Sequence, residues 1–234
     1  MAAEEGQVAD AGSSGAVSIN DQFDIYVDQP LKQFDSPPAL AYVCTEKRDS
    51  DRELFALVCD PKQPPRHDLV SVMQQISQKG LVRAVDWGVV DWPLEGRRCP
   101  AIIYERPRGD RVLVNVDDEP PRMSEEAISR KFVEPAVAVL REMHNKGITH
   151  RAIRLTNLFY DSSPAAQATI MFGECLSAPP AIGQPAVYET IETAMAPPTG
   201  RGPGSVSDDL YAFGVTILAL LIGQNPCVGM SNEE

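Results

Sequence analysis

Long apolar runs and export signals are missing from this sequence. Its longest apolar stretch, residues 213–222, is about half as long as the ~20 residues that a helix needs to span a bilayer. Residues 1–15 have no basic start and no apolar segment, so they do not match a signal peptide. We therefore expect a cytoplasmic location and no insertion of this segment into a membrane.

Cysteine is scarce and shows no metal-binding spacing. The five cysteines are an odd number, they are scattered along the chain, and no two form a CxxC pair. This distribution argues against a disulfide framework and against a zinc site, and it suits a reducing compartment. The expected role of these residues is that of small buried side chains. They are Cys44, Cys59, Cys99, Cys175 and Cys227.

Runs of positive charge are absent as well. The chain has 21 Lys and Arg against 33 Asp and Glu, a formal net charge of -12, and an isoelectric point near 4.7. Such a chain repels phosphate backbones and anionic lipid surfaces. Nucleic acid and membranes are therefore poor candidate partners.

What remains is the composition of an ordinary globular protein in two parts. The 234 residues suffice for one large domain or for two lobes that share a core. The small, polar and acidic residues 1–20 predict a disordered tail. A β-rich part with one helix follows at 21–105, and a helical part at 106–234. This order predicts an α+β fold with two lobes.

Hydrophobic patterning predicts the elements of each lobe. In the first lobe we expect strands at 40–44, 54–59, 82–90 and 101–104, and a helix at 67–78 that Gly80 ends. In the second lobe we expect a long helix from the N-cap Ser124 to Gly147, short strands at 158–160 and 168–171, and an apolar helix from Asp209 to Gly223.

Three motifs in the second half resemble those of the eukaryotic-type protein kinases. Residues 150–157 (HRAIRLTN) follow the long helix where that family has HRDxxxxN. Residues 171–173 (MFG) fall at the DFG position after a strand, and residues 209–214 (DLYAFG) resemble the start of the family's central helix. The resemblance covers about residues 30–225, implies the two-lobed kinase-like fold, and is closest in style to bacterial members.

The same alignment implies that residues needed for phosphoryl transfer are replaced. Ala152 stands at the catalytic base, and Met171 stands at the metal carboxylate, where a thioether is a poor ligand for Mg²⁺. The phosphate-binding lysine falls on Val58, or on Cys59 if the register shifts by one. Residues 35–39 (DSPPA) replace the glycine-rich loop, and their prolines lack N–H donors.

Other positions of the family pattern are kept, and the resemblance gives them structural roles. The retained residues are His150, Arg151, Asn157, Phe172, Gly173 and Asp209. We expect Asn157 and Arg154 to bond the surrounding loop rather than a metal. Leu69 falls near the helix acid that pairs with the lysine in the family. Tyr104 and Glu105 resemble the hinge beside the adenine site. Glu192 is slightly favoured over residues 196–198 as the counterpart of the APE motif.

The sequence therefore predicts a pseudokinase: an inactive kinase-like domain that binds proteins as a scaffold or regulator, with no bound cofactor and no metal. Two alternatives stay open, namely a kinase-like enzyme with altered nucleotide-transfer chemistry and a nucleotide sensor without turnover. The expected partners are proteins of unknown identity, including a second copy of the chain. A homodimer, or further chain past Glu234, would cover the apolar helix that begins at Asp209.

Overall fold

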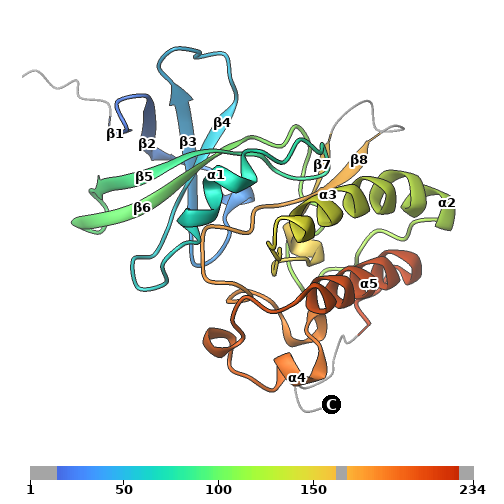
Figure 1. The fold of residues 1–234 in the computed structure, drawn as a ribbon. Helices are drawn as coiled ribbons and strands as arrows, with labels where there is room; N and C mark the ends of the chain where they lie inside the picture. Colours follow the sequence, from blue (N-terminus) through green and yellow to red (C-terminus); the bar gives the residue numbers. More distant parts are fainter. Residues whose placement is uncertain (1–14, 162–167, 227–234) are drawn as a thin grey trace, which may run out of the picture.

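The computed structural model describes residues 15–161 and 168–226 and confirms the α+β architecture of two lobes (Figure 1). The first lobe contains one antiparallel sheet with the strand order β1-β2-β3-β4-β6-β5. Its strands are β1 (Ala16–Ile19), β2 (Phe23–Pro30), β3 (Leu40–Glu46), β4 (Leu54–Val58), β5 (Ala84–Trp92) and β6 (Arg97–Glu105). The second lobe is mostly helical.

The two faces of the sheet belong to two different hydrophobic clusters. Strand β4 lies in the interior of the sheet, between β3 and β6, and every one of its residues is buried. Its alternating side chains divide between the faces. Phe55 and Leu57 join the large core that continues into the second lobe. Ala56 and Val58 join an outer cluster that includes Trp92 and other apolar residues of the sheet.

Strand β1 lies where the sequence predicts the end of a disordered tail. The strand pairs with β2, and Ile19 is only 1% exposed. A side chain at Gly88 of β5 would approach Ile19 Cγ1 to 2.8 Å, so glycine lets the two edges of the curled sheet meet. The predicted tail is therefore too long at its C-terminal end, and its residues 1–14 lie outside the described part of the chain.

The predicted helix at 67–78 is much shorter in the structure. A 3₁₀ turn (His67–Leu69) leads into the single turn of α1 (Val70–Met73). No side chain caps either segment, and Val70 and Val72 are β-branched. Short helices without caps depend on tertiary packing. Only Val70 and Met73 of α1 are buried, so the packing holds one turn and no more.

The second lobe is built on two long helical segments (Figure 1). The first comprises α2 (Glu125–Ile128), a π-helical segment (Ser129–Val133) and α3 (Glu134–Asn145). As predicted, Ser124 caps it by accepting a hydrogen bond from the Ala127 N–H. The second is α5 (Val206–Ile222), which starts three residues before the predicted Asp209 because Ser205 and Asp208 form a capping box. Gly223 ends α5 in the left-handed conformation, φ 70°.

Shorter elements complete the second lobe. They are the hairpin of β7 (Leu158–Asp161) and β8 (Thr169–Phe172), the helix α4 (Ile191–Ala194), and 3₁₀ turns at Leu155–Asn157, Ala186–Tyr188 and Pro198–Gly200. Within the described residues, no helix combines the length and the apolar character needed to cross a bilayer.

The apolar helix α5 is only partly covered. Phe213 and Leu220 are buried in the main core, whereas Leu218 is 47% exposed and Ile222 is 42% exposed. The exposed side also carries Leu210 and Tyr211. The expectation that a homodimer or additional chain covers this helix stays a prediction.

Candidate functional site

Asp209, at the start of α5, holds the loop that carries the HRAIRLTN motif. Its carboxylate is 1% exposed and accepts hydrogen bonds from the backbone N–H of His150 (2.7 Å) and of Arg151 (2.9 Å), and from His144 Nε2 (2.9 Å). Burial alone would raise the pKa of Asp209, but these hydrogen bonds outweigh it and lower the pKa. The retained aspartate thus positions the loop and stays charged.

His150 is a buried structural residue. Its Nδ1 accepts a hydrogen bond from the Ala152 N–H (3.2 Å), and its Nε2 donates to the Gly173 carbonyl oxygen (3.3 Å). The ring centre lies 5.1 Å from that of Phe172, which also packs against Phe132 of the long helix. Burial lowers the pKa of His150 to about 4. The imidazole is therefore neutral at neutral pH and ties the loop to the segment after β8.

This low pKa predicts a stability loss in mild acid. Between pH 6.5 and pH 4 the unfolded chain binds a proton at this histidine and the folded chain does not. The free energy of unfolding should therefore fall as the pH drops through this window, by at most about 3 kcal/mol from this residue. Urea unfolding at a series of pH values measures it. A His150→Asn variant whose stability falls as steeply as that of the wild type would contradict the assignment.

Asn157 lies against Gly173, not against Met171. Its Nδ2 donates to the carbonyl oxygens of Ala152 (2.9 Å) and Glu174 (2.8 Å), and its own carbonyl oxygen accepts the Gly173 N–H (2.7 Å). In the β7–β8 hairpin, Met171 pairs with Phe159, which is two residues after Asn157. The structure therefore places Gly173, and not Met171, beside Asn157. A Cβ there would lie 2.0 Å from Asn157 Oδ1, so this pair leaves no room for a side chain.

Val58 and Cys59, the two candidates for the lysine position, face opposite sides of the sheet. Val58 points into the outer cluster of the sheet, away from the second lobe. Cys59 belongs to the core shared by both lobes, and its thiol lies within the electrostatic range of Glu174. Burial, followed by the negative charge of Glu174, raises the pKa of Cys59 well above its ordinary value. Of the two candidates, Cys59 is thus the one that faces the second lobe, and its thiol is neutral.

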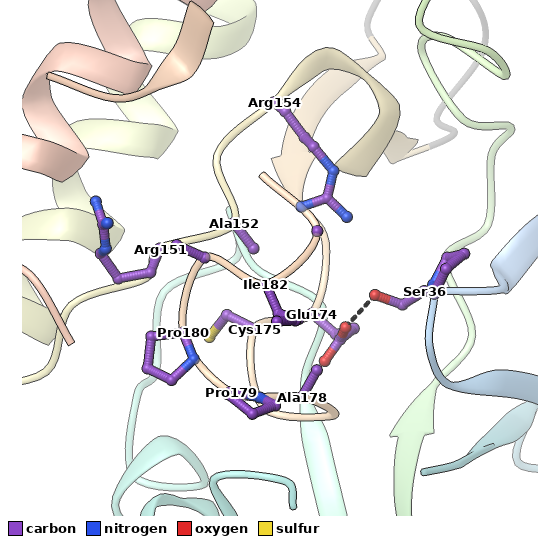
Figure 2. A pocket seen from close by; sticks show the side chains of 13 residues that line it. Ser36, Arg151, Ala152, Arg154, Glu174, Cys175, Ala178, Pro179, Pro180 and Ile182 are labelled. Atoms are coloured by element: carbon purple, nitrogen blue, oxygen red, sulfur yellow. Dashed lines mark hydrogen bonds between the residues drawn. The ribbon is translucent and has the colours of Figure 1, made fainter. Parts of the chain in front are cut away.

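Glu174 joins the two lobes through its carboxylate, which accepts hydrogen bonds on both oxygens. Its Oε2 accepts hydrogen bonds from the Tyr104 hydroxyl (3.1 Å) and from the backbone N–H groups of Leu176 and Ser177 (2.8 Å each). Its Oε1 accepts the Ser177 hydroxyl (2.6 Å) and the Ser36 hydroxyl. Figure 2 shows Ser36 reaching Glu174 across the space between the lobes. The segment that replaces the glycine-rich loop is therefore fixed to the second lobe.

Phe34, just before that segment, fills the space between the lobes from the other side. Its ring stacks on Phe55 of β4 at 5.1 Å and lies 5.7 Å from Phe159 of β7. The guanidinium of Arg111 lies 5.1 Å from the Phe159 ring centre and donates to the carbonyl oxygens of Asp35 and Thr156 (2.8 Å each). Burial lowers the pKa of Arg111 to about 10, so it remains a cation. Aromatic, cation–π and hydrogen-bond contacts thus hold the lobes together.

Little space is left where the motif loops converge. The hollow bounded by Ser36, Pro37, Ala152, Arg154 and residues 178–183 has a volume of about 20 Å³, enough for about one water molecule (Figure 2). Arg154 is 8% exposed and borders this hollow, and burial lowers its pKa. In the described part of the chain, no three His, Cys, Asp or Glu side chains are grouped so that they could hold a metal ion.

Arg151 forms a buried ion pair that sequence reasoning missed. Its Nη2 lies 2.8 Å from Glu189 Oε2, and both side chains are at most 1% exposed. Its Nη1 lies 3.8 Å from Asp208. Glycine is required at Gly204, φ 63°, where a Cβ would lie 2.6 Å from Arg151 Nε. The buried acid is therefore Glu189, whereas Glu192, the residue favoured from the sequence, is exposed.

Sequence signals for two of the missed residues exist but are weak. Glu174 is an isolated acid that directly follows MFG in a segment of apolar and small residues, and buried acids need partners. Glu189 follows an aromatic residue three positions before Glu192. Phe34 has no such signal, because one phenylalanine before a turn is an ordinary core residue.

Comparisons with known proteins agree with this architecture. No model of a known protein family matches the sequence. A stretch of 95 residues (41% of the chain) is 26% identical to serine/threonine-protein kinase pim-2 of Danio rerio and covers 29% of that protein. The structure is similar to a crystal structure of Rad53 residues 1–466 in complex with AMP-PNP, with a TM-score of 0.67 and 16% identity.

The similarity to Rad53 covers 91% of this chain and 51% of the other. The chain thus spans about half of the solved protein and less than a third of pim-2. The two-lobed architecture, the Asp209 anchor and the packing of His150 on Phe172 are arranged around one shared core. By its structure, this chain has a protein-kinase-like fold.

Proposed function

We propose that this chain is a non-catalytic kinase-like domain that acts through contacts with other proteins. The observation that carries the proposal is the closure of the space between the lobes by Phe34 and Glu174. A nucleotide would have to displace the stacking of Phe34 on Phe55 and the five hydrogen bonds that the Glu174 carboxylate accepts. Each buried donor left without an acceptor costs on the order of 1–3 kcal/mol.

The chemistry of the remaining side chains supports the same proposal. Phosphoryl transfer needs a base near the attacking hydroxyl, a carboxylate for the metal and a cation for the phosphates. We propose that the corresponding positions are those of Ala152, Gly173 and Cys59, which offer a methyl group, a bare backbone and a neutral thiol. Glu174, the acid beside them, has both oxygens engaged by hydroxyl and N–H donors. None of these groups can take over the missing roles.

The test is nucleotide binding, because it separates this proposal from the two alternatives. The solved structure of Rad53 contains AMP-PNP, so AMP-PNP and ATP are suitable probes. We expect no shift of the melting temperature of the wild-type chain with either nucleotide, with or without Mg²⁺. A catalytically competent protein kinase under the same conditions serves as the positive control.

The variant Phe34→Ala distinguishes a nucleotide pocket that a side chain fills from the complete absence of such a pocket. Phe34→Ala removes the ring between the lobes and should lower stability by about 3–5 kcal/mol, as for other buried phenylalanines. If the variant then binds adenosine and the wild type does not, Phe34 itself blocks the site. Nucleotide binding by the wild type without label transfer would favour a sensor, and label transfer to any acceptor would contradict the proposal.

A further inference from the structure

A second hollow shares no lining residue with the small hollow described above. It is lined by the chain that follows α1 and by residues of the β7–β8 hairpin, and its volume is about 520 Å³. Its walls are the segments 73–79, 81–83 and 105–108, together with Asp161 and Met171. The shortness of α1 helps to form this groove. The helix ends at Met73, and the residues that follow it form one wall of the groove.

The groove is positively charged on an acidic protein. Four basic side chains line it, namely Lys79, Arg83, Arg106 and Arg108, against the two acids Glu105 and Asp161, which gives a formal charge of four minus two, or +2. Glu105 is already bound by Arg52, with 2.6 Å between the carboxylate and Nη2. The whole chain carries -12. A local positive field of this kind selects and steers an anionic ligand.

Arg106 supplies a donor that lacks an acceptor. Its Nε is buried and makes no hydrogen bond within the described part of the chain. Its guanidinium lies 5.9 Å from the Phe34 ring centre, so aromatic packing holds the side chain. A buried N–H without a partner is costly. A carboxylate bound in the groove would provide the missing acceptor.

The walls of the groove are not only charged. Met73 is 4% exposed, and Met171 is half-buried and packs against the main core. Methionine side chains are flexible and polarisable, and they adapt to varied apolar ligand groups. Lys79 and Arg83 are exposed. The groove thus offers an apolar contact surface together with accessible positive charges.

We propose that this groove binds an acidic segment of a protein partner, with carboxylates against Lys79, Arg83 and Arg106 and one apolar side chain against Met73 and Met171. The inference rests on the proposed protein-binding role and names the chemistry of the partner. A peptide fits better than a polyanion such as nucleic acid, because the net charge of -12 repels a long anionic chain beyond the groove. A short acidic segment contacts only the groove, where the local charge is positive.

Fluorescence polarisation with the full chain tests the proposal. The probe is a labelled short peptide of alternating Glu and Asp with a central Leu, and the control peptide replaces each acid by its amide. We expect binding of the acidic peptide only, weakened by added salt. The double variant K79E/R83E should bind at least about tenfold more weakly. The matched control is Arg98→Glu, an exposed charge reversal next to the β5–β6 turn and outside the groove.

Several results would overturn the assignment. Equal binding of the two peptides, or equal affinity of the wild type and K79E/R83E, would show that the groove does not select ligands by their negative charge. Self-association that K79E/R83E abolishes, without peptide binding, would make a second copy of the chain the occupant. The assay contains no nucleotide, so label transfer from ATP would contradict the proposed inactivity and leave this inference standing. A failure of peptide binding would contradict this inference and leave the proposed inactivity standing.

Discussion

Replacing Glu174 by alanine is expected to lower the free energy of unfolding by about 3–5 kcal/mol. The carboxylate accepts five hydrogen bonds, so its removal leaves the hydroxyls of Ser36, Tyr104 and Ser177 and two backbone N–H groups without an acceptor. Glu174→Gln keeps the shape but turns one oxygen into a donor that faces other donors. We expect it to cost about 1–3 kcal/mol.

Urea unfolding followed by circular dichroism measures both effects. The matched control is Glu192→Gln, an exposed glutamate on α4, which should change stability by less than about 0.5 kcal/mol. If Glu174→Ala costs no more than this control, the carboxylate does not bridge the lobes. The argument for a closed space between them would then rest on Phe34 alone.

The second large effect is expected at the buried ion pair of Arg151 and Glu189. Arg151→Met should cost about 3–5 kcal/mol, because it leaves the carboxylate of Glu189 buried without its close partner. The distance from Arg201 to Glu189 is 3.9 Å, so little compensation is available. The double variant R151M/E189L should recover most of the loss, since two apolar side chains can replace a buried ion pair.

A double-mutant cycle gives the coupling free energy of this pair. The control pair is Arg130 and Glu126, 3.1 Å apart on the surface of the long helix and more than 70% exposed. Arg130→Met should cost less than about 1 kcal/mol. A coupling free energy for Arg151 and Glu189 as small as that of the surface pair would contradict the structural role assigned to Arg151.

These variants matter for function because they test residues that hold the fold together, as distinct from residues that would carry out catalysis. Asp209, His150 and Arg151 are buried, and each bonds to partners in the second lobe. We propose that the positions that would touch a nucleotide have changed together. Cys59, Gly173 and Ala152 are compatible with one another and with the Glu174 hydrogen bonds. This agreement is what is expected if the fold serves as a binding surface.

The sequence by itself determined the architecture of this protein. Hydrophobic patterning predicted β3, β4, β5 and β6 but not β1 and β2. Ser124 and Gly223 marked helix ends that the structure has. The spacing of three motifs identified the kinase-like fold and the loop that Asp209 anchors. These signals are local: a cap, a period or a motif depends on residues close to one another in the chain.

Only the tertiary structure decided which residues meet between the lobes. Whether Val58 or Cys59 faces the second lobe depends on the register of β4, which alternates sides at every residue. Gly173 replaced Met171 beside Asn157 because the β7–β8 pairing set the position. The contact between Ser36 and Glu174 spans 138 positions of sequence. No local pattern encodes such a contact, because it arises from the packing of one lobe on the other.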